Sequence, residues 1–262
     1  AIMKDGGNAF DAAIATQFSL AVVFPGAGNI GGGGFMLARK ANGELIGIDY
    51  REAAPGKATR DMYLDAQGNP ITKKSLDGAS ASGIPGSVAG MIATHAYAKL
   101  SLAKLIEPAI ELAEYGYVIT AREANGLNSQ KANFLKNSSA PSAFTQREWK
   151  AGDTLYQPEL AATLKRIQEK GLAGFYEGET ADFIVKEMQY SEGIITKEDL
   201  KNYQPKFRKP IEFDYKGHHI ISFSPPSSGG IIIAQMLKMI EPFNVGNMGQ
   251  NTEASVSLMI EA

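Results

Sequence analysis

The feature that most constrains the fold is a stretch of 27 residues, from Ala12 to Ala38, that contains no charged side chain. A helix of this length could span a lipid bilayer. The second half of the stretch, however, holds Pro25 and six glycines, a composition that ends a helix. We therefore expect a buried helix up to about Phe24, followed by a tight glycine-rich turn, and no membrane span.

Composition removes several classes of protein. The 262 residues include no cysteine, which excludes a disulfide scaffold, an iron–sulfur cluster and a cysteine nucleophile. The charges are balanced, with 26 Lys and Arg against 28 Asp and Glu, and they are scattered along the chain. The basic stripe of a nucleic-acid-binding protein is therefore missing. A chain of this length can bury enough apolar surface for one core, so we expect a single domain over residues 1–262.

Local signals predict a mixture of helices and hairpins. Asn8 is placed to cap the first helix, and Asn42-Gly43 and Lys216-Gly217 are turn signals between pairs of strands. The predicted strands cover residues 35–39, 45–50, 210–215 and 218–223. The predicted helices cover residues 8–24, 85–100, 102–115, 157–171 and 179–190, a short segment after Thr196, and a last segment that ends at Glu241. This order indicates an α+β layered fold rather than a doubly wound one.

Two patterns suggest a cofactor or a metal, and both have a simpler explanation. Residues 26–31 match the dinucleotide-binding pattern G-x-G-x-x-G, but a predicted strand follows where that site requires a helix N-terminus. Tight backbone packing is the favoured interpretation of these glycines. His218 and His219 are adjacent on a predicted strand, so their side chains point to opposite faces. We therefore expect no cofactor and no metal site.

Two polar positions could bind a ligand. Arg51 follows a predicted strand, and its planar guanidinium suits a carboxylate, although a structural ion pair with Glu52, Asp49 or Asp61 is the favoured explanation. The run Ser227-Ser228-Gly229-Gly230 stands at a predicted helix start, where an anion or a simple cap are both possible. The residues alone favour the structural interpretation at both positions.

Several runs, taken together, resemble the γ-glutamyltranspeptidase family. The matching runs are Gly6-Gly7-Asn8-Ala9-Phe10-Asp11-Ala12-Ala13, Gly28-Asn29-Ile30-Gly31-Gly32-Gly33-Gly34-Phe35-Met36, Asp49-Tyr50-Arg51-Glu52 and Pro225-Pro226-Ser227-Ser228-Gly229-Gly230. They extend over almost the whole chain in the order of the family, which makes the resemblance specific. It implies an N-terminal-nucleophile hydrolase with a four-layer αββα sandwich, in which this chain is part of the large subunit, incomplete at both ends.

The resemblance also implies how the protein is made and what it does. Family members are zymogens that cut themselves into two subunits, and the new N-terminal threonine of the small subunit is the nucleophile. No Thr-Thr run occurs in this chain, so no catalytic residue is expected in it. The expected partners are a small subunit from the same precursor and glutathione or other γ-glutamyl compounds. A periplasmic or extracellular location is implied as well.

One binding residue carries over from the family. Arg51 matches the arginine that holds the α-carboxylate of the γ-glutamyl group, while Tyr50 stands where phenylalanine is usual. The expected function is transfer of the γ-glutamyl group from glutathione to water or to an amino acid. The alternatives are a cephalosporin acylase acting on glutaryl amides, a non-catalytic binding or assembly protein, and a dinucleotide-binding enzyme. The resemblance does not assign a role to residues 31–34 or 227–230.

Overall fold

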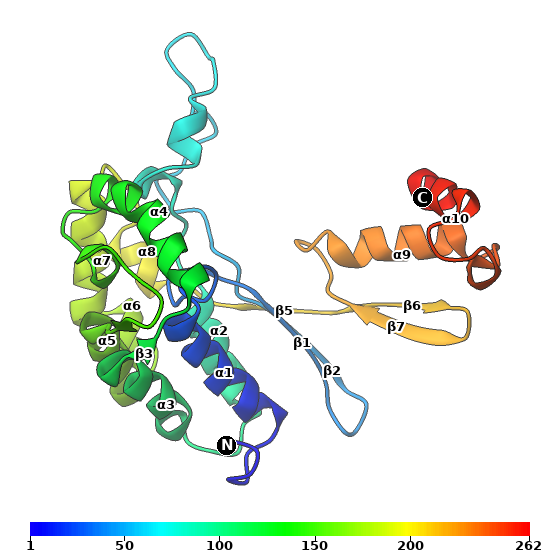
Figure 1. Cartoon of the computed structure of the whole chain (residues 1–262), viewed down its shortest axis with the longest axis horizontal. Coiled ribbons are helices and arrows are strands. Elements are labelled where there is room, and N and C mark those ends of the chain that lie inside the picture. The colour runs from blue at the N-terminus through cyan, green and yellow to red at the C-terminus, as the bar shows by residue number, and fades with distance from the viewer. The chain divides into compact units, whose positions relative to one another are not determined.

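The computed structural model describes all residues from 1 to 262, and they divide into two compact units (Figure 1). The first unit comprises Ala1–Gly34 and Tyr50–Pro205, and the second comprises Phe35–Asp49 and Lys206–Ala262. The single domain expected over residues 1–262 stays a prediction, and the units are described separately. Both contain helices and strands, so the expected α+β class is confirmed.

The first unit is mainly helical. Its elements are α1 (Ala9–Val23), α2 (Ser87–His95), α3 (Leu102–Tyr115), β3 (Tyr117–Val118), α4 (Ala121–Asn137), β4 (Thr154–Leu155), α5 (Pro158–Lys170), α6 (Ala173–Tyr176), α7 (Gly178–Tyr190) and α8 (Lys197–Lys201). Helix α1 packs on α3, α3 on α5, α5 on α6 and α6 on α7 (Figure 1). The main core lies between these helices and includes Phe18, Leu105 and Leu164, all with 0% exposure.

The first helix forms as the sequence predicts. The Asn8 side chain accepts hydrogen bonds from the backbone N–H groups of Phe10 and Asp11, and the Asp11 carboxylate accepts one from the Asn8 N–H. This reciprocal arrangement is a capping box, which satisfies donors that a helix N-terminus otherwise leaves unpaired. The helix ends at Val23, immediately before Phe24 and Pro25.

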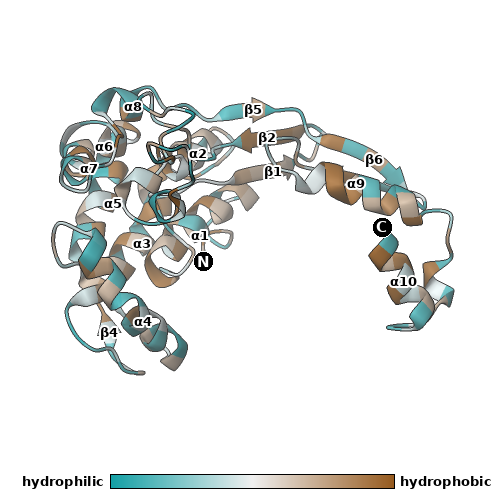
Figure 2. Ribbon diagram, turned by 90° about the horizontal axis from the view of Figure 1, so that it is seen from above, coloured by the Kyte–Doolittle hydropathy of each residue, from teal (hydrophilic) through white to brown (hydrophobic).

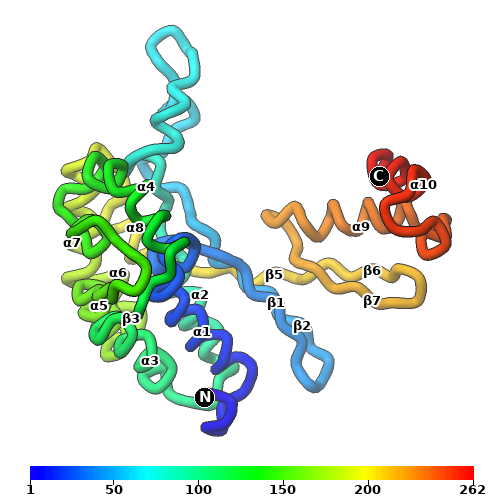
Figure 3. The backbone as a smooth tube through the Cα atoms, in the orientation of Figure 1, coloured from blue at the N-terminus to red at the C-terminus, as the bar shows by residue number.

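Several predicted boundaries differ from the structure. Helix α2 ends at His95 instead of about Leu100, because the chain turns there and the His95 ring lies 2.8 Å from the Leu100 carbonyl oxygen. Helix α3 continues through Pro108, where a kink or a restart was expected. Between β2 and α2 the chain follows a long irregular path, coloured blue to cyan in Figure 3, with two short 3-10 turns.

Helix α4 was not predicted, although it has a clear start signal. Thr120 and Glu123 form a capping box at its N-terminus, a T-x-x-E pattern that is visible in the sequence. Its own small core consists of apolar residues from α4, from the segments on either side of it and from β4: Ile119, Ala124, Leu127, Trp149 and Leu155.

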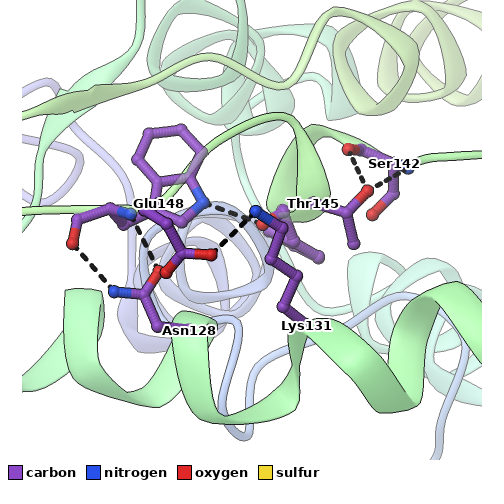
Figure 4. Close-up of polar contacts among 7 residues, drawn as sticks. Asn128, Lys131, Ser142, Thr145 and Glu148 are labelled. Carbon is purple, nitrogen blue, oxygen red and sulfur yellow. Dashed lines mark hydrogen bonds and ion pairs between the residues drawn. The ribbon is translucent and has the colours of Figure 1, made fainter.

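Polar contacts fix the loop after α4 against the helix (Figure 4). The Asn128 side-chain amide donates to the Trp149 carbonyl oxygen at 2.9 Å, and its oxygen accepts from the Trp149 N–H at 2.8 Å. The indole N–H donates to the Phe144 carbonyl oxygen at 2.7 Å, and Lys131 pairs with Glu148 at 2.9 Å. Asn128 thus satisfies backbone groups that neither a helix nor a sheet would satisfy in this loop.

The second unit contains the hairpins. Its elements are β1 (Phe35–Arg39), β2 (Leu45–Asp49), β5 (Lys206–Arg208), β6 (Ile211–Tyr215), β7 (His218–Ser222), α9 (Gly229–Ile240) and α10 (Glu253–Glu261). Strands β1, β2 and β5 form an antiparallel sheet in the order β1-β2-β5, with Phe35 opposite Asp49, and β6 pairs with β7. The predicted turns are confirmed, with positive φ angles at Gly43, Lys216 and Gly217.

Many apolar side chains of the second unit are exposed. Gly230 is the one buried residue of α9, and Figure 2 shows how apolar residues predominate along this helix. The large apolar side chains of α9, α10 and their connection that are at least 39% exposed are Ile231, Ile232, Ile233, Met236, Met239, Phe243, Val256, Met259 and Ile260.

This surface leads to a first prediction. The isolated chain 1–262 is expected to bind a hydrophobic dye strongly or to aggregate, because exposed apolar patches of this kind favour association. Dye fluorescence and light scattering measured against a monomeric standard would check this. A clean monomer with a sharp cooperative thermal transition and no dye binding would contradict it.

None of the helices combines the length and the apolar content that crossing a bilayer requires.

Candidate substrate-binding site

The backbone around Arg51 is held on both sides, within the first unit. On one side Tyr50 exchanges two backbone hydrogen bonds with Gly34, at 3.0 and 3.3 Å. On the other side Ala53 exchanges two with Ile84, at 2.8 and 3.2 Å. The chain between these pairings has little freedom, so Arg51 projects from a fixed main chain, as a binding residue requires.

The glycine-rich turn packs directly against this segment. A Cβ atom on Gly33 would lie 2.6 Å from the Tyr50 carbonyl oxygen and 2.7 Å from the Glu52 nitrogen, so only glycine fits. The Gly32 carbonyl oxygen accepts from the N–H groups of Gly86 and Ser87 at the start of α2, at 2.7 and 2.9 Å. Strand β1 follows the turn, as predicted, instead of the helix N-terminus that a dinucleotide site needs.

Tyr50 anchors the segment in the interior. The residue is 6% exposed, and its hydroxyl donates to the side-chain oxygen of Gln17 on α1 at 3.3 Å. Burial raises the pKa of Tyr50, and the hydrogen bond with Gln17 opposes this. Gln17 thus provides a partner for the Tyr50 hydroxyl group, which the phenylalanine expected here from the resemblance would lack.

The Arg51 side chain is 54% exposed, and its Nε lies 3.4 Å from a carboxylate oxygen of Glu52. Of the other acidic residues considered as ion-pair partners, Asp49 pairs with Arg208 at 2.8 Å and Asp61 lies 3.8 Å from Arg60. An exposed ion pair of this kind contributes about 0–1 kcal/mol to stability. The role of Arg51 in binding a carboxylate stays a prediction.

A cavity of about 340 Å³ adjoins this segment, and Glu52 is part of its wall. The rest of the wall comes from the loop after Glu52, from the residues before α2, including Ser82, and from Ile194. Its volume lies in the range of small-ligand sites, and hydroxyl groups among apolar side chains are typical of such sites. The loop that carries Arg51 therefore borders this cavity through Glu52, and Arg51 itself does not line it.

Two residues near Arg51 were missed by the sequence analysis. The Tyr203 hydroxyl donates to the Arg51 carbonyl oxygen at 2.7 Å, and the Asp199 carboxylate accepts from the Gly56 N–H at 2.8 Å. Thr196 and Asp199 form a capping box that the sequence could have revealed, but only as a helix start. No local signal marks Tyr203, because its partner is 152 residues away in the chain.

The other polar positions considered from sequence belong to the second unit. Ser227 to Gly230 belong to the second unit, where α9 begins at Gly229 and the Ser228 side chain forms no capping hydrogen bond. His219 lies between two carboxylates, 2.9 Å from Asp214 and 3.1 Å from Glu212. These hydrogen bonds, first that with Asp214 and then that with Glu212, raise the pKa of His219. No group of three or more histidine and acidic side chains has the geometry to hold a metal ion.

Comparison with known proteins defines the class to which this fold and site belong. Residues 1–262 match the Gamma-glutamyltranspeptidase family. Superposition on the Helicobacter pylori γ-glutamyltranspeptidase structure gives a TM-score of 0.95 with 45% identity, covering 99% of this chain and 76% of that chain. The chain therefore belongs to the γ-glutamyltranspeptidase family and has its N-terminal-nucleophile hydrolase fold.

Individual relatives refine this assignment. The chain is 46% identical to the glutathione hydrolase proenzyme of Escherichia coli K12, with a match over 100% of this chain and 46% of that protein. It thus spans about half the length of the curated relatives it matches. A cephalosporin acylase from Bacillus halodurans is similar at 27% identity, with a TM-score of 0.85 over 99% of this chain and 49% of that chain.

Proposed function

We propose that this chain is the large-subunit portion of a γ-glutamyltransferase that also hydrolyses glutathione. The enzyme would transfer the γ-glutamyl group of glutathione to water or to an amino-acid or peptide acceptor. The observation that carries the proposal is the Arg51-Glu52 pair, which presents a cation and an anion side by side at 3.4 Å on a fixed loop. The α-carbon of a γ-glutamyl group carries a carboxylate and an ammonium group, which such a pair complements.

The reaction would proceed in two acyl-transfer steps. The threonine hydroxyl of the small subunit would attack the γ-carbonyl carbon while the threonine α-amine takes the hydroxyl proton. The C–N bond then breaks, and that proton passes to the leaving amine. Water or an acceptor amine next attacks the resulting ester and releases the threonine. Arg51 would grip the α-carboxylate through two parallel hydrogen bonds and so hold the γ-carbonyl near the nucleophile.

A cephalosporin acylase is the second candidate, favoured by the similarity to the Bacillus halodurans enzyme. A glutaryl amide has the corresponding carboxylate but no α-ammonium group, so it can use only the cationic half of the Arg51-Glu52 pair. Assays of the two-subunit protein on a γ-glutamyl anilide and on a glutaryl amide would separate the candidates. The γ-glutamyl substrate is expected to be strongly preferred, and a preference for the glutaryl amide would overturn the proposal.

A second prediction concerns this chain without its partner. Purified residues 1–262 should not hydrolyse a γ-glutamyl anilide above the buffer rate, because the proposed nucleophile belongs to the small subunit. The same preparation mixed or co-expressed with the small subunit serves as the positive control. Linear turnover by the chain alone that survives repurification would show that the roles are assigned to the wrong subunit.

The proposed partners are the small subunit from the same precursor, together with glutathione and related γ-glutamyl compounds. A periplasmic or extracellular location is proposed from family membership, and γ-glutamyl-anilide activity in cell fractions would test it. A non-catalytic binding or assembly role is the remaining alternative. It would be supported if the two-subunit protein bound γ-glutamyl compounds without turnover.

A further inference from the structure

Tyr203 reaches the loop that carries Arg51 from a distant part of the chain. It follows α8, and its hydroxyl donates to the Arg51 carbonyl oxygen at 2.7 Å. This bond falls between the backbone pairings of Tyr50 and Ala53, at the residue whose side chain is proposed to bind substrate. A shift of this carbonyl would rotate the adjoining Cα, and with it the direction of the guanidinium.

Tyr203 is itself held in place. Its ring stacks on that of Tyr176, with centroids 5.8 Å apart and planes within 5° of parallel, and it packs against the main core. Tyr176 is buried, donates to the Pro85 carbonyl oxygen at 2.8 Å and accepts from the Ala89 N–H at 3.2 Å. Tyr203 therefore connects the rigid core to the main chain of Arg51.

Gly86 packs closely against the Tyr203 hydroxyl group that bonds to the Arg51 carbonyl oxygen. A Cβ atom on Gly86 would lie 2.2 Å from the Tyr203 hydroxyl oxygen and 2.0 Å from the Tyr50 carbonyl oxygen. The side chain of any larger residue at position 86 would therefore clash with the Tyr203 hydroxyl group. Such a fit indicates a fixed hydroxyl position rather than a chance surface contact.

The same chain segment holds the loop at a second point. The Asp199 carboxylate of α8 accepts from the Gly56 N–H at 2.8 Å, on the C-terminal side of Arg51. Burial favours the neutral acid here, but the hydrogen bonds from Gly56 and Thr196, together with the charge of Lys57, more than offset it and lower the pKa of Asp199. The carboxylate is therefore charged at neutral pH, where it accepts the bond most strongly.

We propose that Tyr203 is a positioning residue that sets the selectivity of the enzyme for substrates with an α-carboxylate, acting through the main chain of Arg51. The inference rests on the proposed function, because it presumes that Arg51 binds this carboxylate. It assigns no contact between Tyr203 and substrate. Its effect should appear in substrate discrimination and KM rather than in the chemistry at the threonine.

The test is Tyr203→Phe in the two-subunit enzyme, since phenylalanine keeps the stack on Tyr176 and removes only the hydroxyl. The readout is the ratio of kcat/KM for a γ-glutamyl anilide to that for a 4-aminobutyryl anilide, which keeps the ammonium group and lacks the α-carboxylate. One lost hydrogen bond should lower this ratio about fivefold, mainly through a higher KM for the γ-glutamyl substrate. An unchanged ratio would overturn the inference.

Tyr176→Phe is the matched control, because it removes a hydroxyl group from the other ring of the same stack, and that hydroxyl bonds to Pro85 and Ala89. It is expected to lower the melting temperature and to leave the substrate ratio unchanged. An equal fall in the ratio for both variants would overturn the inference, because it would indicate a general loss of rigidity around the two stacked rings. In an Arg51→Ala background, Tyr203→Phe should cause no further fall, and an additive effect would show that Tyr203 acts independently of Arg51.

The single variant Arg51→Ala distinguishes a failure of the proposed function from a failure of the proposed role of Tyr203. If it leaves the substrate ratio unchanged, the proposed role of Arg51 fails and the inference fails with it. If it lowers the ratio strongly while Tyr203→Phe does not, the proposed function stands and only the role of Tyr203 is wrong.

Discussion

Replacing Arg51 by alanine in the two-subunit enzyme is expected to lower kcat/KM for a γ-glutamyl anilide about a hundredfold or more. A hydrogen bond to a charged group is worth roughly 1.5–3 kcal/mol, and a carboxylate left without its partner costs more. Each ~1.4 kcal/mol corresponds to a factor of ten in rate. The fold should survive, because the Arg51 side chain is 54% exposed and its ion pair with Glu52 is a surface pair.

Arg51→Lys tests whether charge alone is sufficient. Lysine keeps the charge but loses the planar fork, so a large loss should remain. The control substrate is a 4-aminobutyryl anilide, which lacks the α-carboxylate, and either substitution should change its turnover very little. If Arg51→Ala cleaves the γ-glutamyl substrate within about threefold of the native rate, the ion pair with Glu52 is the better explanation of this arginine.

The elements that could be predicted from sequence are those whose signals are local. Asn8 and Asp11 close a capping box within four residues, and Gly43 and Gly217 adopt the positive φ angles that their hairpin turns need. The place of Arg51 beyond a strand was likewise visible, because alternating apolar residues mark β2. Such features depend on a few neighbouring residues, so their physics is contained in a short window of sequence.

The contacts that fix the site are not local, and for that reason they escaped prediction. Tyr203 lies 152 residues from Arg51, and Asp199 lies 143 residues from Gly56. Nothing in the residues around Tyr203 distinguishes it from an ordinary tyrosine after a short helix. The glycines at 32–34 were visible as a turn, but only the structure shows that Gly33 is required by the backbone of Tyr50 and Glu52.

Asp11 belongs to the capping box of α1 and also makes hydrogen bonds to a distant part of the chain. Its carboxylate has 0% exposure and accepts N–H groups from Asn8 at 2.7 Å, Leu100 at 2.8 Å and Lys99 at 3.0 Å. It therefore caps α1 and also holds the connection between α2 and α3. Helix α1 carries Gln17, the partner of Tyr50, so the stability of this cap supports the segment that bears Arg51.

Asp11→Ala is accordingly expected to destabilise the protein by about 3–5 kcal/mol. Three backbone N–H groups would lose their acceptor, and each buried unsatisfied donor costs about 1–3 kcal/mol, partly relieved by local relaxation. The measurement is denaturant unfolding of the two-subunit protein. Asp65→Ala is the matched control, because Asp65 also accepts the N–H groups of Gln67 and Asn69 but lies in an exposed turn where water can replace it. That substitution should have a small effect, and equal losses for the two variants would contradict the role of burial.

The same carboxylate should make the stability depend on pH. Burial acts to raise the pKa of Asp11, but the hydrogen bonds from Asn8, Leu100 and Lys99 outweigh it and lower the pKa from the ordinary value of 3.8. A lowered pKa in the folded state means that the stabilisation is present above the unfolded value and is lost as the pH falls through the folded value. Asp11→Asn should therefore be much less stable than the native protein at pH 6, and the difference should shrink steadily below about pH 4. A difference that stays constant from pH 6 to pH 3 would show that the charge of Asp11 does not stabilise this junction.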